Sequence, residues 1–151
     1  MKKPRYYVDT SVIGGCYDAK FATPSRAFLA MVRNGEITLI ASSLLIEELA
    51  PSPPRVRRML DELPSIHVER LAASDESLEL QANYLKAKVV GKASAQDAHH
   101  VALATIGRAD IIVSWNFKHI VNIAKINGFN AVNLMMGYNT IDIRSPMEVV
   151  R

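Results

Sequence analysis

Four side chains with the potential for catalysis come directly after strand-like apolar runs or lie in the helical runs beside them: Asp9, Glu48, Asp97 and Asn116. Carboxylates that converge on one place repel each other, and their pKa values rise unless a cation neutralises them. Oxygen ligands without thiolates suit Mg²⁺ or Mn²⁺. Such ions activate water and stabilise the charge that develops during phosphodiester cleavage, often as a pair about 4 Å apart. These residue types therefore indicate divalent-metal chemistry on a phosphodiester.

Each acid also has a purely structural interpretation. Asp9 could cap the segment that follows it. One of Glu47 and Glu48 is expected to be ordinary helix surface, because the pair straddles a buried apolar stripe. The pattern Ser94-x-x-Asp97 matches an N-terminal capping box. The functional interpretation therefore depends on whether the acids meet.

Two adjacent histidines, His99 and His100, follow Asp97. An Asp–His pair on one helix could move protons, but packing or local hydrogen bonding is the commoner role of such histidines. The sequence has no HExxH zinc motif, no GxGxxG after the first strand and no GxxxxGK[ST] phosphate loop. Zinc proteolysis, dinucleotide binding and P-loop chemistry therefore lack their signatures.

The elements that must position these residues alternate between short β-prone runs and helical runs. Strands are expected at residues 5–8, 37–41, 66–71, 111–113, 131–134 and 141–143. Helices are expected at residues 24–33, 43–50, 54–63, 75–88, 95–106 and 117–127, with a short one around Val12 and Ile13. Thr23 is expected to cap the first long helix. This order predicts βαβ units in an α/β, three-layer α/β/α fold with a central, mainly parallel sheet of about five strands.

Ligands of such sheets bind outside the carboxyl ends of the strands. Asp9 and the segment 114–116 follow directly after strands, and Glu48 lies in the helix after another. They should therefore share one edge, whereas Asp110 precedes its strand and should lie at the opposite edge.

Length and composition fit a single domain, residues 1–151. Hydrophobic residues make up 49% and charged residues 22%, which disfavours disorder. Cys16 is the only cysteine, so no intramolecular disulfide can form. No signal-peptide core or membrane span is recognisable, and a cytoplasmic location is expected. The net charge of +3 permits an anionic partner; the basic segment 54–58 is either solvated helix surface or a phosphate-contacting surface.

Four blocks of the sequence, in this order, resemble the PIN-domain family, which includes the VapC toxins of toxin–antitoxin pairs: YVDTSVIGG (7–15), SSLLIEEL (42–49), AQDAHHVALAT (95–105) and ADIIVSWNFKHI (109–120). Each block is weakly diagnostic alone, but the set is fairly specific and its span covers most of the chain. The resemblance implies a PIN-like parallel sheet and a Mg²⁺- or Mn²⁺-dependent endoribonuclease. It also implies RNA as substrate, an antitoxin protein as a candidate partner and a homodimer.

The resemblance assigns roles to individual residues. Asp9, Glu48 and Asp97 look like the metal-binding carboxylates, and the Ser11 hydroxyl would support Asp9. Many members of the family have an aspartate where this chain has Asn116. Asparagine can offer a carbonyl oxygen or orient water but supplies no charge, so a second metal would be held more weakly. Asp9, Glu48, Asp97 and Asn116 form the expected catalytic set.

Two rival functions remain open at this stage. One is a catalytically weak or inactive RNA-binding module on the same fold, which Asn116 mildly favours and the three acids disfavour. The other is a haloacid-dehalogenase-type phosphatase, whose DxDxT motif would need an aspartate at Ser11. Metal-dependent cleavage of RNA would separate the first rival from the nuclease. The sequence does not identify the RNA target.

Overall fold

The structure, a computed structural model, describes residues 2–150. Within this range five parallel strands form one sheet in the order β3-β2-β1-β4-β5. The strands are β1 (Arg5–Val8), β2 (Thr38–Ser42), β3 (Val68–Leu71), β4 (Ile111–Val113) and β5 (Asp142–Arg144). The α-helices are α1 (Thr10–Gly15), α2 (Ala22–Arg33), α3 (Ser43–Leu49), α4 (Pro54–Asp61), α5 (Asp75–Lys86), α6 (Ala95–Ile106), α7 (Ile123–Met135) and α8 (Pro146–Val149). Two short 3-10 helices are η1 (Ser65–His67) and η2 (Lys92–Ser94).

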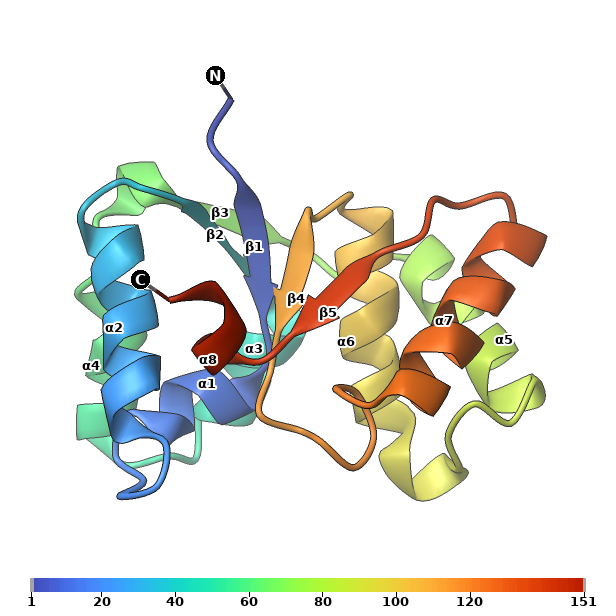
Figure 1. The fold of residues 1–151 in the computed structure, drawn as a ribbon, viewed down its shortest axis with the longest axis horizontal. Coiled ribbons are helices and arrows are strands. Elements are labelled where there is room, and N and C mark those ends of the chain that lie inside the picture. Colours follow the sequence, from blue (N-terminus) through green and yellow to red (C-terminus); the bar gives the residue numbers. More distant parts are fainter. Residues whose placement is uncertain (1, 151) are drawn as a thin grey trace.

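Helices cover both faces of the sheet (Figure 1). The helices α5, α6 and α7 pack on one face, and α1, α2 and α4 pack on the other. The short α8 returns to pack on α2. The predicted three-layer α/β/α fold with a parallel sheet is confirmed. No helix among the described residues has the length and apolar character that a membrane crossing requires.

The central strands divide their side chains between two cores because successive residues of a strand point to opposite faces. Tyr7 stands in register with Ile40 and with Ile112, and all three are buried in the core under α5, α6 and α7. Val8 and Val113, one residue further along, are buried in the opposite core. Burial on both faces explains why these strands read as continuous apolar runs.

A helix was expected at 117–127 and a strand at 131–134; residues 123–127 are helical, but the assignments of 117–122 and of 131–134 were wrong. The helix α7 starts only at Ile123, because the Asn122 side chain caps it by accepting the N–H of Lys125 at 3.0 Å. It then runs through 131–134. Gly128 does not end α7 but allows close packing, since a Cβ there would lie 2.9 Å from a methyl group of Val89.

The first long helix also begins earlier than expected. Phe21 occupies the N-cap position of α2, so Thr23 is not its cap. Pro24 lies within the first turn, where a missing N–H breaks no helical hydrogen bond.

The carboxyl ends of β1, β2 and β4 meet at one edge of the sheet, where α1 and α3 begin (Figure 1). Asp9 directly follows β1, and Ser42 at the end of β2 caps α3 by accepting the N–H of Leu45 at 3.1 Å. Asp110 lies before β4 and accepts the N–H of Arg5, the first residue of β1, at 2.7 Å. Asp110 is therefore at the opposite edge, as predicted.

Candidate active site

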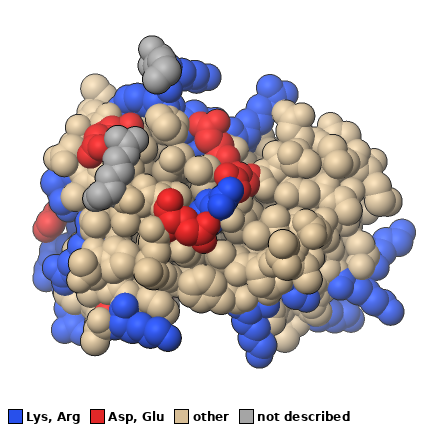
Figure 2. Space-filling model, viewed as in Figure 1, with Lys and Arg blue, Asp and Glu red and all other residues tan. Residues whose placement is uncertain are grey.

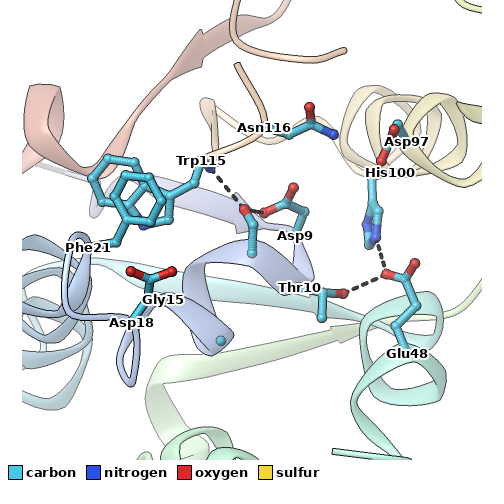
Figure 3. A pocket seen from close by; sticks show the side chains of 12 residues that line it. Asp9, Thr10, Gly15, Asp18, Phe21, Glu48, Asp97, His100, Trp115 and Asn116 are labelled. Carbon is cyan, nitrogen blue, oxygen red and sulfur yellow. Dashed lines mark hydrogen bonds and ion pairs between the residues drawn. The ribbon is translucent and has the colours of Figure 1, made fainter. Parts of the chain in front are cut away.

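A pocket of about 500 Å³ opens at the carboxyl ends of β1, β2 and β4. Its lining includes all four predicted catalytic residues: Asp9, Glu48, Asp97 and Asn116. Figure 3 shows Glu48 and His100 on one side of Asp9, and the stacked rings of Phe21 and Trp115 on the other. The fold thus gathers residues from four separate parts of the sequence around one hollow.

Asp9 is 4% exposed and is held by two serine hydroxyls. Ser11 Oγ donates to Asp9 Oδ1 at 2.5 Å, and Ser114 Oγ donates to Oδ2 at 2.6 Å. Each serine oxygen in turn accepts a backbone N–H from the loop after β4. The N–H of Trp115 donates to Ser11 Oγ and the N–H of Asn116 donates to Ser114 Oγ, both at 2.9 Å. Asp9 makes no side-chain capping bond to α1, so the capping interpretation was wrong. The serines instead connect this carboxylate to the β4 loop.

The surroundings of Asp9 disfavour its ionised form. Burial raises the pKa of its carboxyl group above the ordinary value, and the nearby carboxylate of Asp97 adds to the effect. The neighbouring His100 and the hydroxyls of Ser11 and Ser114 act in the opposite direction without cancelling it. A buried acid that another acid faces across a pocket would gain from a bound cation.

Glu48 on α3 is held from two other helices. Its Oε1 accepts a hydrogen bond from Thr10 Oγ1 at 2.6 Å and one from His100 Nε2 at 2.5 Å (Figure 3). The second oxygen, Oε2, takes no part in these two bonds. Burial acts to raise the pKa of Glu48, but the bonds from His100 and Thr10 outweigh it and lower the pKa. Glu48 is therefore a preoriented, ionised carboxylate at neutral pH.

His100 is itself fixed by a buried chain of hydroxyl groups. The Tyr7 hydroxyl lies 2.5 Å from His100 Nδ1 and 2.9 Å from Ser42 Oγ. Ser42 Oγ accepts the N–H of Leu45 at the start of α3. For a neutral imidazole, one direction satisfies all of these groups: Ser42 donates to Tyr7, Tyr7 donates to Nδ1, and Nε2–H donates to Glu48. The chain therefore sets both the tautomer and the orientation of the imidazole.

The two adjacent histidines have different surroundings. His99 lies 3.1 Å from Ser77 Oγ on α5, and burial lowers its pKa. His100 bonds to Tyr7 and Glu48, which lie far from it in the sequence. Both histidines therefore form hydrogen bonds to other helices or strands instead of the local ones that were expected. The acid that binds His100 is Glu48, and not the Asp97 of its own helix.

Asp97 lies half-buried in the first turn of α6 and faces the pocket. The Ser94 side chain makes no capping bond to α6, so the capping-box interpretation of Asp97 was wrong. Of the two adjacent glutamates, Glu47 is exposed and lines another hollow with Ser43 and His99. Glu48 is the member of the pair that reaches the site.

Asn116 lies above Asp9 at the rim of the pocket (Figure 3). Its Oδ1 accepts the N–H of His119 at 2.9 Å, which closes a turn in the loop after β4. The amide oxygen is therefore already bonded to the backbone, and the NH₂ group is the donor that Asn116 can offer to a ligand. An aspartate could close the same turn and would add a negative charge to the rim.

The donor groups of the pocket fit a hard divalent ion. Within residues 2–150, no three His, Cys, Asp or Glu side chains lie close enough together to hold an ion by themselves. The carboxylates of Asp9, Glu48 and Asp97 nevertheless share one pocket, and Asp97 acts on the pKa of Asp9. Mg²⁺ commonly keeps several waters and takes only one or two carboxylates. The arrangement suits an ion bound partly through water.

Sequence reasoning expected Ser42 or Ser43 to cap the helix at 43–50, and Ser42 is the cap. It assigned no role in the site to several residues that shape it: Tyr7, Thr10, Ser42, Ser114 and, as a partner of Glu48, His100. Ser114 directly follows a central strand, and the sheet-edge rule that selected Asn116 applies equally to it. Tyr7 and Ser42 act through contacts between elements that are far apart in the sequence, for which a single sequence carries no signal.

Solved structures with the same fold support the architecture. VapBC2 from Rickettsia felis bound to a DNA fragment from its promoter matches with a TM-score of 0.58 at 15% identity, over 93% of this chain and 98% of that one. FitAB bound to an IR36 DNA fragment matches with a TM-score of 0.56 at 16% identity, over 97% of this chain and 98% of that one. FitAcB from Neisseria gonorrhoeae matches with a TM-score of 0.53 at 14% identity, over 95% of this chain and 99% of that one. At these identities the likeness establishes the fold.

A search of curated proteins finds no match to the chain. The family model described as PIN domain matches residues 5–118, a span that begins with β1 and includes every residue of the candidate site from Asp9 to Asn116. The chain therefore belongs to the PIN domain family, whose members are generally nucleases.

Proposed function

We propose that this chain is a Mg²⁺- or Mn²⁺-dependent endoribonuclease that hydrolyses RNA phosphodiester bonds. The observation that carries the proposal is the state of Asp9, a buried carboxylate at the end of a central strand, braced by two hydroxyls and sharing a pocket with Glu48 and Asp97. Folding places this acid where its ionised form is disfavoured, which makes sense when a cation binds there. Membership of the PIN domain family supports nuclease chemistry.

The chain's own residues would bind the ion and orient the reacting groups. A bound divalent ion supplies Lewis-acid charge to the phosphate and makes water more acidic. Asp9, Glu48 and Asp97 are the residues that would hold it. Thr10 and His100 keep Glu48 in one orientation. Asn116 can donate its NH₂ group to a water or to a phosphate oxygen.

The test is cleavage of labelled RNAs, and of DNAs of the same sequence, with Mg²⁺ or Mn²⁺ and with a chelator. Wild type is compared with Asp9→Asn and with Asp110→Asn, which changes an acid at the opposite edge of the sheet. We expect the RNA to be cut only with metal, the Asp9 variant to be inactive and the Asp110 variant to be active. Equal activity of both variants would remove Asp9 from the mechanism.

Loss of activity in Asp9→Asn should not reflect unfolding. Because burial raises the pKa of Asp9, its ionised form is a destabilising feature of the metal-free protein at neutral pH. Asparagine removes this charge but leaves one of the two serine hydroxyls without its acceptor. The two effects oppose each other, so we expect the variant to stay folded and to melt close to wild type in chelator at pH 7. Wild type, but not the variant, should gain thermal stability when Mn²⁺ is added.

A second candidate is an RNA-binding module with little or no cleavage. The observation that favours it is Asn116, whose amide oxygen is occupied by the N–H of His119 and which adds no charge to the pocket. RNA binding without cleavage at any metal concentration would support this candidate and exclude the nuclease.

We also propose that the chain is the toxin of a toxin–antitoxin pair and forms a homodimer. The solved structures with its fold include VapBC2 and FitAB, each bound to a DNA fragment, and four sequence blocks resemble VapC toxins. Co-purification with the product of a neighbouring small gene, and relief of growth arrest by that product, would test the pairing. Light scattering of the purified chain would test the dimer.

Basic side chains for RNA contact are scattered. On the face shown in Figure 2, Lys and Arg lie mainly around the outline, whereas acidic groups gather nearer the middle. In the basic segment 54–58, Arg57 donates to the carbonyl groups of Ala50 and Ser52 and so closes the end of α3. The guanidinium of Arg55 lies 5.0 Å from the ring centroid of Tyr17. Arg55 and the exposed Arg58 are the members of this segment that we propose for phosphate contact.

A further inference from the structure

One half of the pocket is not used by the proposed metal chemistry. Beyond Asp9 the pocket continues to Gly14, Gly15, Asp18, Phe21 and Trp115. We propose that this half is a subsite for one unpaired guanine base of the RNA, next to the bond that is cut. The inference rests on the proposed function and names a substrate preference for that same site.

An aromatic wall at fixed distance from the catalytic acid forms one side of the subsite. The rings of Phe21 and Trp115 stack with centroids 4.1 Å apart and planes inclined by 21° (Figure 3). Trp115 Nε1 donates to Ser25 Oγ at 2.8 Å, and its backbone N–H donates to Ser11 Oγ at 2.9 Å. Ser11 also donates to Asp9, so one hydroxyl ties the wall to the carboxylate. Trp115 is 6% exposed and Phe21 is half-buried, so the face of Phe21 turned away from Trp115 is the one on which an unpaired base could stack.

The floor of the subsite consists of two glycines with different functions. A Cβ on Gly15 would lie 2.6 Å from Ser25 Oγ and 2.9 Å from Trp115 Nε1, so the wall itself requires this glycine. A Cβ on Gly14 would meet no atom within 4 Å. The fold therefore does not require glycine at position 14, and glycine weakens a helix relative to alanine. Its absent side chain leaves the hollow open for a ligand.

The end of the subsite carries a carboxylate, which selects among the bases. Asp18 is exposed, and its Oδ1 accepts the backbone N–H of Lys20 at 2.9 Å, which orients the group. A carboxylate accepts two parallel N–H bonds from one partner. Guanine presents two adjacent N–H donors on its Watson–Crick edge, N1–H and the 2-amino group. Adenine, cytosine and uracil each present one donor beside an acceptor, which would face the carboxylate oxygen. The edge must be free of pairing, so the RNA must be single-stranded there.

A cation lies over the Phe21 ring of the wall. Lys20 Nζ lies 5.4 Å from the centroid of the Phe21 ring. A base that stacks on Phe21 would displace this ammonium from the ring face, and the long Lys20 side chain could then contact the phosphate that follows the base. Aromatic surface, hydrogen-bond acceptor and cation together match a nucleotide better than an uncharged apolar ligand.

The experiment measures binding without metal, so that it does not depend on cleavage. Fluorescein-labelled oligouridylates carry one central guanine, inosine or adenine, and their affinity is read by anisotropy in EDTA. Inosine keeps N1–H but lacks the 2-amino group. We expect the guanine probe to bind roughly tenfold more tightly than the inosine probe, as for loss of one bond to a charged acceptor, and to exceed the adenine probe by more, because adenine also turns an acceptor toward the carboxylate.

Two pairs of variants test the residues. Asp18→Asn keeps an acceptor for the Lys20 N–H and should lose the preference for guanine, whereas Asp61→Asn, an exposed acid outside the pocket, should keep it. Gly14→Leu should weaken binding of every probe about tenfold, whereas Gly14→Ala should weaken it little; thermal melting of both shows whether the fold is retained. Equal affinity for the three probes, or an unchanged preference in Asp18→Asn, would overturn the subsite.

Cleavage of the same probes with Mn²⁺ separates this inference from the proposed function. Guanine-selective binding without cleavage would refute the nuclease and leave the subsite standing. Cleavage without any guanine preference would refute the subsite and leave the nuclease standing.

Discussion

The buried hydroxyl of Tyr7 offers a direct test of how the site is held together. Tyr7→Phe removes one oxygen and keeps the ring in the core, where Tyr7 is fully buried. His100 Nδ1 and Ser42 Oγ then lose the group that lies between them. Without the Tyr7 hydroxyl at Nδ1, the imidazole of His100 is no longer held in one orientation, so its hydrogen bond to Glu48 should weaken.

The size of the effect follows from the number of buried polar groups left without a partner. Leaving such a group unsatisfied costs about 1–3 kcal/mol. For a chain of this size that corresponds to a fall in Tm of roughly 2–12 °C. Changes to groups that orient a metal ligand typically reduce metal affinity or activity by about 10–100-fold. Tyr7→Phe should therefore reduce both stability and Mn²⁺ affinity.

Tyr84→Phe is the matched control. Tyr84 is as deeply buried as Tyr7, and its hydroxyl bonds to Asn133 and Thr105 in the core under α5, α6 and α7, away from the pocket. We expect Tyr84→Phe to lower the Tm about as much as Tyr7→Phe does, but to change Mn²⁺ affinity and RNA cleavage little. Mn²⁺ affinity is measured by electron paramagnetic resonance of free Mn²⁺, and cleavage at a temperature where both variants are folded. If the two variants lose metal affinity equally, the chain from Tyr7 to Glu48 has no role in the site, and this reasoning is refuted.

Three further predictions concern Cys16, the two glycines of α1 and Asn116. Burial raises the pKa of Cys16 from 9.0 to about 11, so the thiol of the folded protein keeps its proton at pH 8. Iodoacetamide at pH 8 should therefore modify Cys16 far more slowly in the folded protein than in urea. The free energy of unfolding should fall between pH 9 and 11, because the thiol ionises first in the unfolded chain. Gly15→Ala should lower the free energy of unfolding by about 1–3 kcal/mol through its clash with Trp115, whereas Gly14→Ala should be neutral or stabilising in chemical denaturation. Asn116→Asp keeps the turn and adds a charge, so Mn²⁺ should bind more tightly and RNA should be cut faster; unchanged affinity in a Mn²⁺ titration would show that this position does not influence the metal.

The strands and the sheet edge were predictable because two physical regularities act locally. Strands buried on both faces read as apolar runs, and parallel strands place their carboxyl ends together. Asp9 and Asp110 show the strength of the second rule, since their positions after and before a strand decided which edge each one occupies. The rule needs only strand direction, which the alternation of strands and helices supplies.

The region after β4 was not predictable for the opposite reason. Gly128 resembles a helix terminator, but it is the contact point of α7 with Val89, a partner distant in the sequence. The actual start of α7 depends on one side chain, Asn122, which caps the helix. With the glycine taken as an end, the remaining apolar residues at 131–134 were too short a run to be distinguished from a strand.

His100 differs from these cases, because the sequence did carry a signal for it. Residues three apart on a helix lie on the same face, so placing Asp97 at the site also places His100 there. The bond to Glu48 then follows from geometry, since α3 and α6 each bring one side chain to the same pocket. Spacing rules cannot identify the partner of the other ring nitrogen, because Tyr7 reaches His100 from β1 through the core that α6 covers. The face of a helix can thus be assigned from its own sequence, whereas the tautomer of a histidine on that face depends on a partner from another element.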